Sequence, residues 1–236
     1  MMKCMHIHIG ETEINLSADG KFRSVAEEAI REARRIIEEK IRSDPFFGMT
    51  YDPYEPLDDD PELIQRMCAA SVTAGVGPMA SVAGAVAANV TERLAEAGCK
   101  HAVVDNGGDI SLMTDHETII KIYTGNDSTD GTGFIIPSTD GKIMGICSSS
   151  GRIGHSVSLG NSDISTVFSG DPILSDACAT TLGNMISYIS DLQTAVETVC
   201  RIPGIRGCLA IMDGSVAFFG DLPEFILLSD LPKKLA

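Results

Sequence analysis

Residues 101–113, HAVVDNGGDISLM, contain the clearest fold signal of the chain. Two short apolar runs flank the segment Asp105-Asn106-Gly107-Gly108-Asp109, a pattern that predicts two antiparallel strands joined by a glycine turn. Consecutive glycines permit positive φ and leave backbone N–H groups open to a ligand. An Asn-Gly turn alone would require neither Gly108 nor Asp109, so we expect Asn106, Gly107, Gly108 and Asp109 to contact a ligand.

Working outward, short β-type runs and longer helical patterns alternate with turn residues along the rest of the chain. The helical patterns cover residues 24–43, 62–73, 79–97, 172–189 and 192–201, with Asp171 as the expected N-cap of the fourth. The other expected strands are 3–16, as a strand or hairpin arm, then 118–123, 133–136, 143–148 and 165–169, and a hairpin of 208–212 with 216–219 around Asp213-Gly214. The length of 236 residues suits one large domain or two small ones.

Two local patterns near the N-terminus have a structural and a functional interpretation. Ser24 and Glu27 have the S-x-x-E spacing of a capping box at the start of the first helix. His6 and His8 alternate along the first strand and so share one face, where they could bind a metal. Exposure on a strand surface is the favoured interpretation of this pair.

The segment 44–61 contains four prolines and a cluster of carboxylates. Proline disfavours helix, so we expect a loop. The acidic residues lack the spacing of an EF-hand loop, which favours a solvated acidic loop over a calcium site. Its acidic cluster consists of Asp52, Glu55, Asp58, Asp59 and Asp60.

Composition excludes several classes of partner. The net charge is −15, and such a surface repels phosphate backbones and anionic lipids, so we expect neither nucleic-acid nor membrane partners. The seven cysteines include no C-x-x-C pair, and the N-terminus lacks the apolar core of a signal peptide. We therefore expect a cytoplasmic protein.

The segment SSSGRIGHS, residues 148–156, follows a predicted strand and is dense in small hydrogen-bond donors. We expect Ser149, Ser150, Gly151 and Arg152 to bind a phosphate or carboxylate. His155 is the candidate general acid or base, although a ligand contact or a hydrogen bond that stabilises the turn would also explain it.

Asp176 and Thr180 are four residues apart in the helical pattern that follows Pro172, and so project from one face. A carboxylate with a hydroxyl suits Mg²⁺, which takes few protein ligands and keeps water or phosphate for its other positions. The alternative is that Asp176 only complements the helix dipole.

A fourth segment, Gly75-Val76-Gly77-Pro78, leads into a helix whose one face carries only small residues, Ala80, Ala83, Gly84, Ala87 and Ala88. Gly77 is a candidate ligand contact, since a glycine loop at a helix N-terminus can bind an anion. The small-residue face allows close approach either of another backbone or of a flat ligand.

Taken in order, four blocks resemble the signatures of an uncharacterised prokaryotic family in the ApbE-like superfamily. They are AGVGPMASVAGAVAANV (74–90), VVDNGGDI (103–110), CSSSGRIGHSVSLGNSD (147–163) and LSDACATTLGN (174–184). The resemblance implies an α+β, T-fold-like antiparallel sheet packed against long helices, in one domain over 1–236 and in a homo-oligomer. In the superfamily's Mg²⁺-dependent FAD:protein FMN transferases these blocks line the flavin site, which implies Mg²⁺ at Asp176 and Thr180 and FAD or FMN as the ligand.

The sequence also departs from those transferases. They carry Lys-Gly before the small-residue helix, where this chain has Val76-Gly77, and they carry a D-P-x-T-G segment that is absent here. The blocks also contain no aromatic side chain on which an isoalloxazine ring could stack. The leading hypothesis is an ApbE-like protein that binds a flavin or another phosphorylated small molecule with Mg²⁺, as a flavin or nucleotidyl transferase. The alternative is a non-catalytic small-molecule-binding or assembly protein that retains the fold only.

Overall fold

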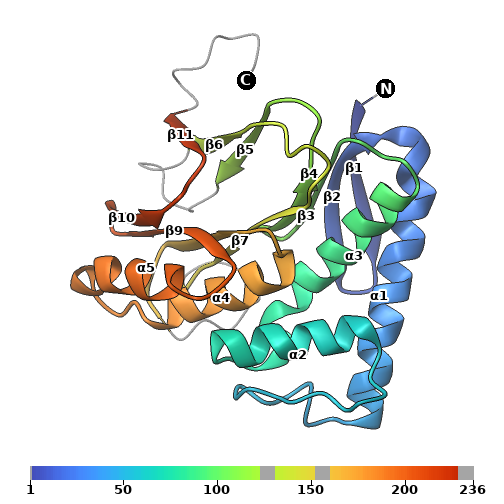
Figure 1. The fold of residues 1–236 in the computed structure, drawn as a ribbon, viewed down its shortest axis with the longest axis horizontal. Coiled ribbons are helices and arrows are strands. Elements are labelled where there is room, and N and C mark those ends of the chain that lie inside the picture. The colour runs from blue at the N-terminus through green and yellow to red at the C-terminus, as the bar shows by residue number, and fades with distance from the viewer. Residues whose placement is uncertain (1, 123–130, 152–159, 228–236) are drawn as a thin grey trace.

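The computed structural model describes residues 2–122, 131–151 and 160–227, and its main feature is one large antiparallel sheet (Figure 1). The strand order is β1-β2-β3-β4-β7-β8-β9-β10, and a second sheet has the order β11-β6-β5. The strands of the large sheet are β1 Met2–Ile9, β2 Thr12–Asp19, β3 Ala102–Asn106, β4 Asp109–Met113, β7 Met144–Ser149, β8 Ile164–Ser169, β9 Ile205–Met212 and β10 Ser215–Gly220. Those of the small sheet are β5 Thr118–Ile122, β6 Thr132–Ile136 and β11 Glu224–Leu227.

The helices gather on one face of the large sheet, and the small sheet lies on the other (Figure 1). They are α1 Arg23–Ser43, α2 Glu62–Ala74, α3 Val82–Glu96, α4 Pro172–Asn184 and α5 Leu192–Cys200, with short 3₁₀ turns η1 Gly20–Phe22, η2 Pro78–Ser81 and η3 Ile189–Asp191. The result is the mixed α+β class that the sequence predicts, with an antiparallel sheet against long helices.

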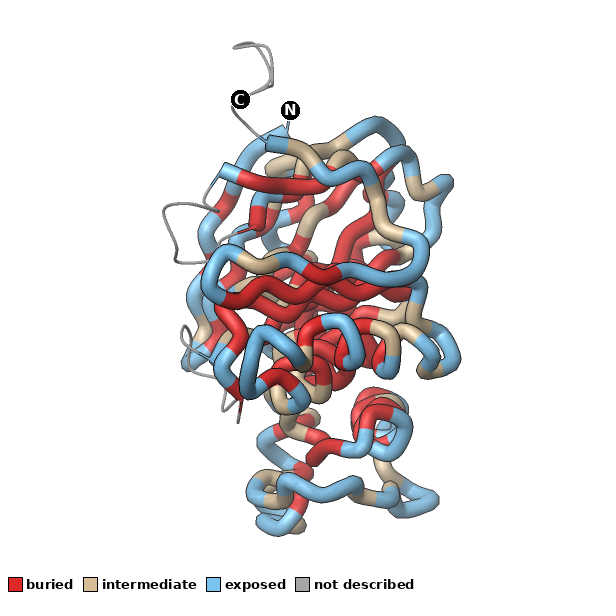
Figure 2. The backbone as a smooth tube through the Cα atoms, turned by 90° about the vertical axis from the view of Figure 1, so that its left-hand side faces the viewer, coloured by how far each residue is buried: buried red, intermediate tan, exposed pale blue. Residues whose placement is uncertain are grey.

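Two hydrophobic cores hold these layers together. The larger core lies between the helices and the sheet, and the smaller one lies between the two sheets, around Phe134 and Phe168. All six residues of β8 are buried, because helices cover one of its faces and the small sheet covers the other. Figure 2 shows buried backbone along the strands and the helices that face them, with exposed backbone in the outer loops.

Local signals predict several boundaries correctly. Asp171 caps α4 by accepting a hydrogen bond from the backbone N–H of Ile173, at 3.0 Å. In the hairpin of β9 and β10 both turn residues, Asp213 and Gly214, have positive φ, as a two-residue hairpin loop requires. His6 and His8 are exposed on β1, as expected.

Other local predictions are wrong for identifiable reasons. Ser24 lies inside α1, which has Phe22 at its N-cap and no side-chain cap, so the predicted capping box does not form. The fourth helix ends at Asn184 rather than near Ile189. Segment 44–61 contains no helix or strand, as predicted, but Asp60 is not solvated, because it forms a buried ion pair with Lys40.

In the described residues no single helix is long and apolar enough to cross a membrane. Only α2 taken together with residues 78–96 has the necessary length and composition, and that pair is bent by 105° at its break.

Candidate functional site

The β3–β4 turn places Asp109 beside β7. Asn106 pairs with Asp109, so the two-residue loop is Gly107-Gly108, with φ of 72° and 101°. The prediction that a hairpin turn would not require Gly108 is therefore wrong, since a loop of this kind needs positive φ at both positions. The Asp105 carboxylate accepts from the Gly108 N–H at 2.9 Å and fixes the turn.

Three buried oxygens near this turn have no hydrogen-bond partner, and they are the only such side-chain atoms in the described part of the chain. They are Asp109 Oδ1, Ser111 Oγ and Ser149 Oγ. Side chains alternate along a strand, and Asp109 pairs with Cys147, so all three oxygens lie on the same face of β4 and β7. Cys147 contacts the Pro172 carbonyl of α4, which shows that this is the face covered by helices.

On the helix side, Asp176 of α4 meets the first turn of α3. Its Oδ2 accepts from the Gly84 N–H at 2.7 Å, and so satisfies an N–H that has no partner within the helix. A Cβ at Gly84 would lie 2.6 Å from the Pro172 carbonyl oxygen and 2.7 Å from Asp176 Cβ. At Gly84 the small-residue face therefore serves close packing of α3 on α4.

Asp109 and Asp176 form a coupled pair of carboxyl groups. Burial raises the pKa of Asp109 well above its ordinary value, and the charge of Asp176 raises it further, while a hydrogen bond from the Ser148 backbone opposes both effects. Burial also raises the pKa of Asp176 to about 7, against hydrogen bonds from Gly84, Asp109 and Ala83 that lower it. The pair therefore holds a proton at neutral pH when no cation is bound.

No lysine or arginine side chain forms an ion pair or a hydrogen bond with Asp109 or Asp176 among the described residues. A buried carboxylate pair is costly unless its charge is neutralised, by protons or by a bound cation. Together with the unpartnered hydroxyl oxygens of Ser111 and Ser149, the pair makes an oxygen-rich donor set of the kind that a hard cation such as Mg²⁺ prefers. Thr180 lies one turn after Asp176 on α4 and is half-buried.

Other predicted residues surround this pair. The Asn106 amide donates to the Ala83 carbonyl at 3.1 Å, so it holds the turn against α3. A Cβ at Gly151 would lie 2.1 Å from the Gly160 carbonyl oxygen, so the chain needs glycine where 151 and 160 cross. Ser149 and Ser150 precede Gly151 directly, whereas Arg152 and His155 lie outside the described residues.

The acidic loop, residues 44–61, packs against Gly77. A Cβ at Gly77 would lie 2.0 Å from the Thr50 carbonyl oxygen and 3.0 Å from Tyr51 Cα, so this glycine accommodates the loop backbone. Tyr51 is 73% exposed. An aromatic side chain therefore lies beside a predicted ligand contact, although it comes from a segment that the sequence assigns only to a loop.

Sequence reasoning missed Ser111 and Tyr51. Ser111 stands two residues after Asp109, so strand alternation was the available signal that it shares a face with that carboxylate. For Tyr51 no local signal exists, because its neighbourhood depends on packing between segments about 25 residues apart. A cavity of about 190 Å³ between β1 and α1, lined by residues such as Ile9 and Arg34, contains none of the predicted site residues.

Comparison with known proteins identifies the family. The family model described as "AbpE bacteria" matches residues 2–212. The chain belongs to the UPF0280 family. A UPF0280 protein of Methanocella arvoryzae is 42% identical over 226 residues, which cover 96% of this chain and 92% of the relative. Another from Methanosarcina barkeri is 39% identical, covering 93% and 87%.

Solved structures show the same fold at low sequence identity. The ApbE protein of Thermotoga maritima aligns with a TM-score of 0.65 and 12% identity, covering 93% of this chain and 97% of that one. The flavinyl transferase ApbE of Pseudomonas stutzeri, in its apo form, aligns with a TM-score of 0.58 and 11% identity, covering 93% and 94%. This UPF0280 chain therefore has an ApbE-like fold, as the sequence blocks predicted.

Proposed function

We propose that this UPF0280 protein binds a flavin or another phosphorylated small molecule together with Mg²⁺, and that it acts as a flavin or nucleotidyl transferase. The observation that carries the proposal is the buried Asp109–Asp176 pair, which shares one face with the unpartnered oxygens of Ser111 and Ser149. The fold shared with a flavinyl transferase is consistent with it.

In this proposal Asp176 and Thr180 hold the ion, and Asp109 completes the negative charge around it. Bound there, Mg²⁺ would neutralise phosphate charge and stabilise the leaving group of a phosphoryl transfer. The Asp109 and Asp176 carboxyls release their shared proton on cation binding, so affinity should rise with pH. The Gly107-Gly108 turn and Ser149 to Arg152 contact the ligand, and His155 is the candidate acid or base.

Tyr51 supplies the aromatic surface that the sequence blocks lack. The loop backbone is fixed against Gly77, while the ring itself is exposed and free to lie on a planar ligand. Tyr51→Ala should weaken flavin binding by up to about tenfold, in line with one stacking contact of about 0.5–1.5 kcal/mol. Tyr51→Phe keeps the ring and should bind like the parent protein, and equal affinity of all three proteins would exclude the stacking role.

A thermal-shift matrix tests the main proposal. The protein is melted with FAD, FMN or inorganic pyrophosphate, each in Mg²⁺ and in EDTA. We expect a shift of several degrees that needs both ligand and Mg²⁺, because a ligand that binds only the native state raises the melting temperature. Absence of a shift with every ligand, in a protein that melts cooperatively, would refute the proposal.

Asp176→Ala and Thr180→Val separate binding from folding. Asp176 also caps α3, so its alanine variant loses a structural contact as well as a metal ligand. Thr180 has no such contact among the described residues, so Thr180→Val should leave the melting temperature in EDTA unchanged and abolish the Mg²⁺-dependent shift.

The second candidate is a non-catalytic binding or assembly protein, and the cap that Asp176 places on α3 favours it. Equal ligand affinity in Mg²⁺ and in EDTA, for the parent and for both variants, would favour this second candidate. We propose a homo-oligomer in the cytoplasm for either function.

A further inference from the structure

A second cluster of metal-ligating side chains lies at the other end of the β3–β4 hairpin. His101 directly precedes β3, and Asp115 and His116 lie in the connection from β4 to β5. One potential ligand atom from each residue lies within 4.8 Å of the other two. We propose that His101, Asp115 and His116 bind one divalent transition-metal ion of the Zn²⁺ class.

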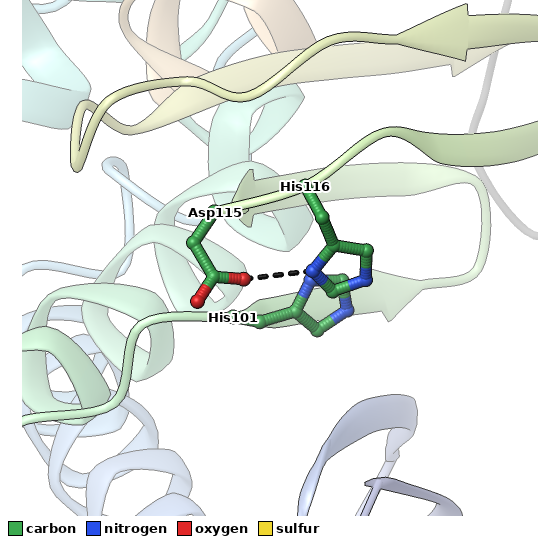
Figure 3. A group of neighbouring side chains, drawn as sticks. All are labelled: His101, Asp115 and His116. Atoms are coloured by element: carbon green, nitrogen blue, oxygen red, sulfur yellow. Dashed lines mark hydrogen bonds and ion pairs between the residues drawn. The ribbon is translucent and has the colours of Figure 1, made fainter.

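The three side chains are already arranged around a common edge. The imidazole rings of His101 and His116 stack with centroids 4.4 Å apart and planes inclined by 16°. Nδ1 of His116 lies 2.7 Å from Asp115 Oδ1. Figure 3 shows the two rings one over the other, with the Asp115 carboxylate at their shared edge.

Thr114 fixes the buried member of the cluster. Its Oγ1 lies 2.8 Å from Nδ1 of His101 and donates to the His116 carbonyl at 2.7 Å. In metal sites such a partner holds the ring nitrogen that does not bind the ion, so with Nδ1 held by Thr114 the ligand atom of His101 would be Nε2. His101 is 9% exposed, whereas the side chains of Asp115 and His116 are more than half exposed. One ligand is therefore fixed and two can adjust.

A metal requires one of the two rings to turn. The lone pairs of an imidazole lie in its ring plane, and the planes of His101 and His116 are only 16° apart, so their lone pairs do not converge as they stand. Ligands of a tetrahedral zinc ion, with bonds of about 2.0–2.1 Å, lie about 3.3 Å from one another. The exposed His116 is the ring that can turn, and the ligand atoms, now within 4.8 Å of one another, would then approach. The ion would take the place of the hydrogen bond between His116 and Asp115, and water would fill its fourth position.

The donor set suits this class of ion. Two imidazoles and one carboxylate favour zinc and its neighbours over Mg²⁺, which prefers oxygen ligands alone.

The cluster is separate from the Asp109–Asp176 site. The register runs from Ala102 opposite Met113 to Asn106 opposite Asp109, and four residue steps along a strand span about 13 Å. An ion at the cluster would connect β3 of the large sheet to the segment that enters the small sheet. The inference is thus independent of the proposed function.

Cobalt provides the test, because Co²⁺ bound in a tetrahedral site absorbs visible light. Protein stripped with a chelator is titrated with Co²⁺ and then with Zn²⁺. We expect the visible absorption to saturate at one Co²⁺ per chain with Mg²⁺ in excess, to be abolished by Zn²⁺, and to be accompanied by a melting temperature that Zn²⁺ raises.

The variants are chosen so that folding is preserved. His116→Ala and Asp115→Asn remove exposed ligands and should each weaken Co²⁺ binding by at least about tenfold, with an unchanged melting temperature in EDTA. His8→Ala, which removes an exposed histidine of β1, should bind Co²⁺ like the parent. Absorption that persists in His116→Ala, or a parent protein that binds no Co²⁺, would overturn the inference.

Discussion

Asp176 has two roles, one in holding the fold and one in the carboxyl pair with Asp109. It caps the N-terminus of α3 through Gly84, and it shares a buried face with Asp109. A cap needs only an acceptor, which asparagine also supplies, whereas proton sharing and cation binding need a carboxyl group. Asp176→Asn therefore separates the two contributions.

The pH dependence of stability follows from the raised pKa of Asp176. With a pKa of about 7 in the folded state against 3.8 unfolded, the native carboxyl keeps a proton that the unfolded chain loses between these values. The free energy of unfolding should therefore fall as pH rises from about 4 to 7, by on the order of 4 kcal/mol from this group. Asp109 contributes in the same direction.

Urea unfolding in EDTA at pH 5 and at pH 7.5 measures this effect. The parent should lose more stability between the two pH values than Asp176→Asn does. Equal losses in the two proteins would show that Asp176 titrates normally.

Gly84→Ala tests the close approach of α3 and α4. Alanine would ordinarily favour a helix by about 1 kcal/mol. Here its Cβ would lie 2.6 Å from a backbone oxygen of Pro172, which cannot rotate away. We expect a net loss of about 1–3 kcal/mol in chemical denaturation.

Gly170→Ala is the matched control, because nothing lies within 4 Å of the added Cβ and φ is not positive. It should be neutral or slightly stabilising. A stabilised Gly84→Ala protein would mean that the two helices can separate without cost.

At the scale of elements, the acidic loop is held by a buried ion pair. Lys40 Nζ lies 2.8 and 2.7 Å from the two oxygens of Asp60, and both side chains are less than 10% exposed. The ammonium group also lies 5.3 Å from the ring centroid of Tyr54 and 5.8 Å from that of Phe47. The loop therefore folds around Lys40, and this fixes the segment that carries Tyr51.

Asp60→Ala should destabilise the protein by about 3–5 kcal/mol, since it leaves a buried ammonium group without its partner. Asp59→Ala, at an exposed neighbouring position, should change stability by less than about 0.5 kcal/mol. Thermal and urea unfolding of both variants provide the comparison. The double variant Lys40→Met/Asp60→Leu should recover much of the loss, and a failure to recover would show that the pair itself favours folding.

The elements also show where sequence reasoning succeeds. The N-cap Asp171 and the turn Asp213-Gly214 depend on residues close in sequence, and both are confirmed. The Lys40–Asp60 pair and strand β11 depend on contacts across 20 and about 90 residues, and neither was predicted. The candidate site shows the same difference between local and distant contacts. Asp109 and Asp176 each lie in one of the four sequence blocks, but no local pattern indicates that the two carboxyl groups lie close together.

At the scale of the whole molecule, the two edges of the large sheet differ. The β1 edge presents Lys3, His6 and His8 to solvent, and charged or polar side chains discourage pairing with another sheet. The β10 edge presents Val216 and Phe218, which are 49% and 64% exposed. An apolar strand with unpaired backbone groups favours association, so we expect the oligomer to form through β10.

Sedimentation equilibrium of the full chain should give a mass above that of one 25.0 kDa chain. Phe218→Lys should shift the distribution toward monomer, because it places a charge where an apolar contact forms, while Phe218 contributes little to the buried core of its own chain. His6→Lys on the β1 edge is the control and should leave the mass unchanged. A parent protein that sediments as a monomer at micromolar concentration would exclude the oligomer, and dissociation by His6→Lys alone would assign the interface to β1.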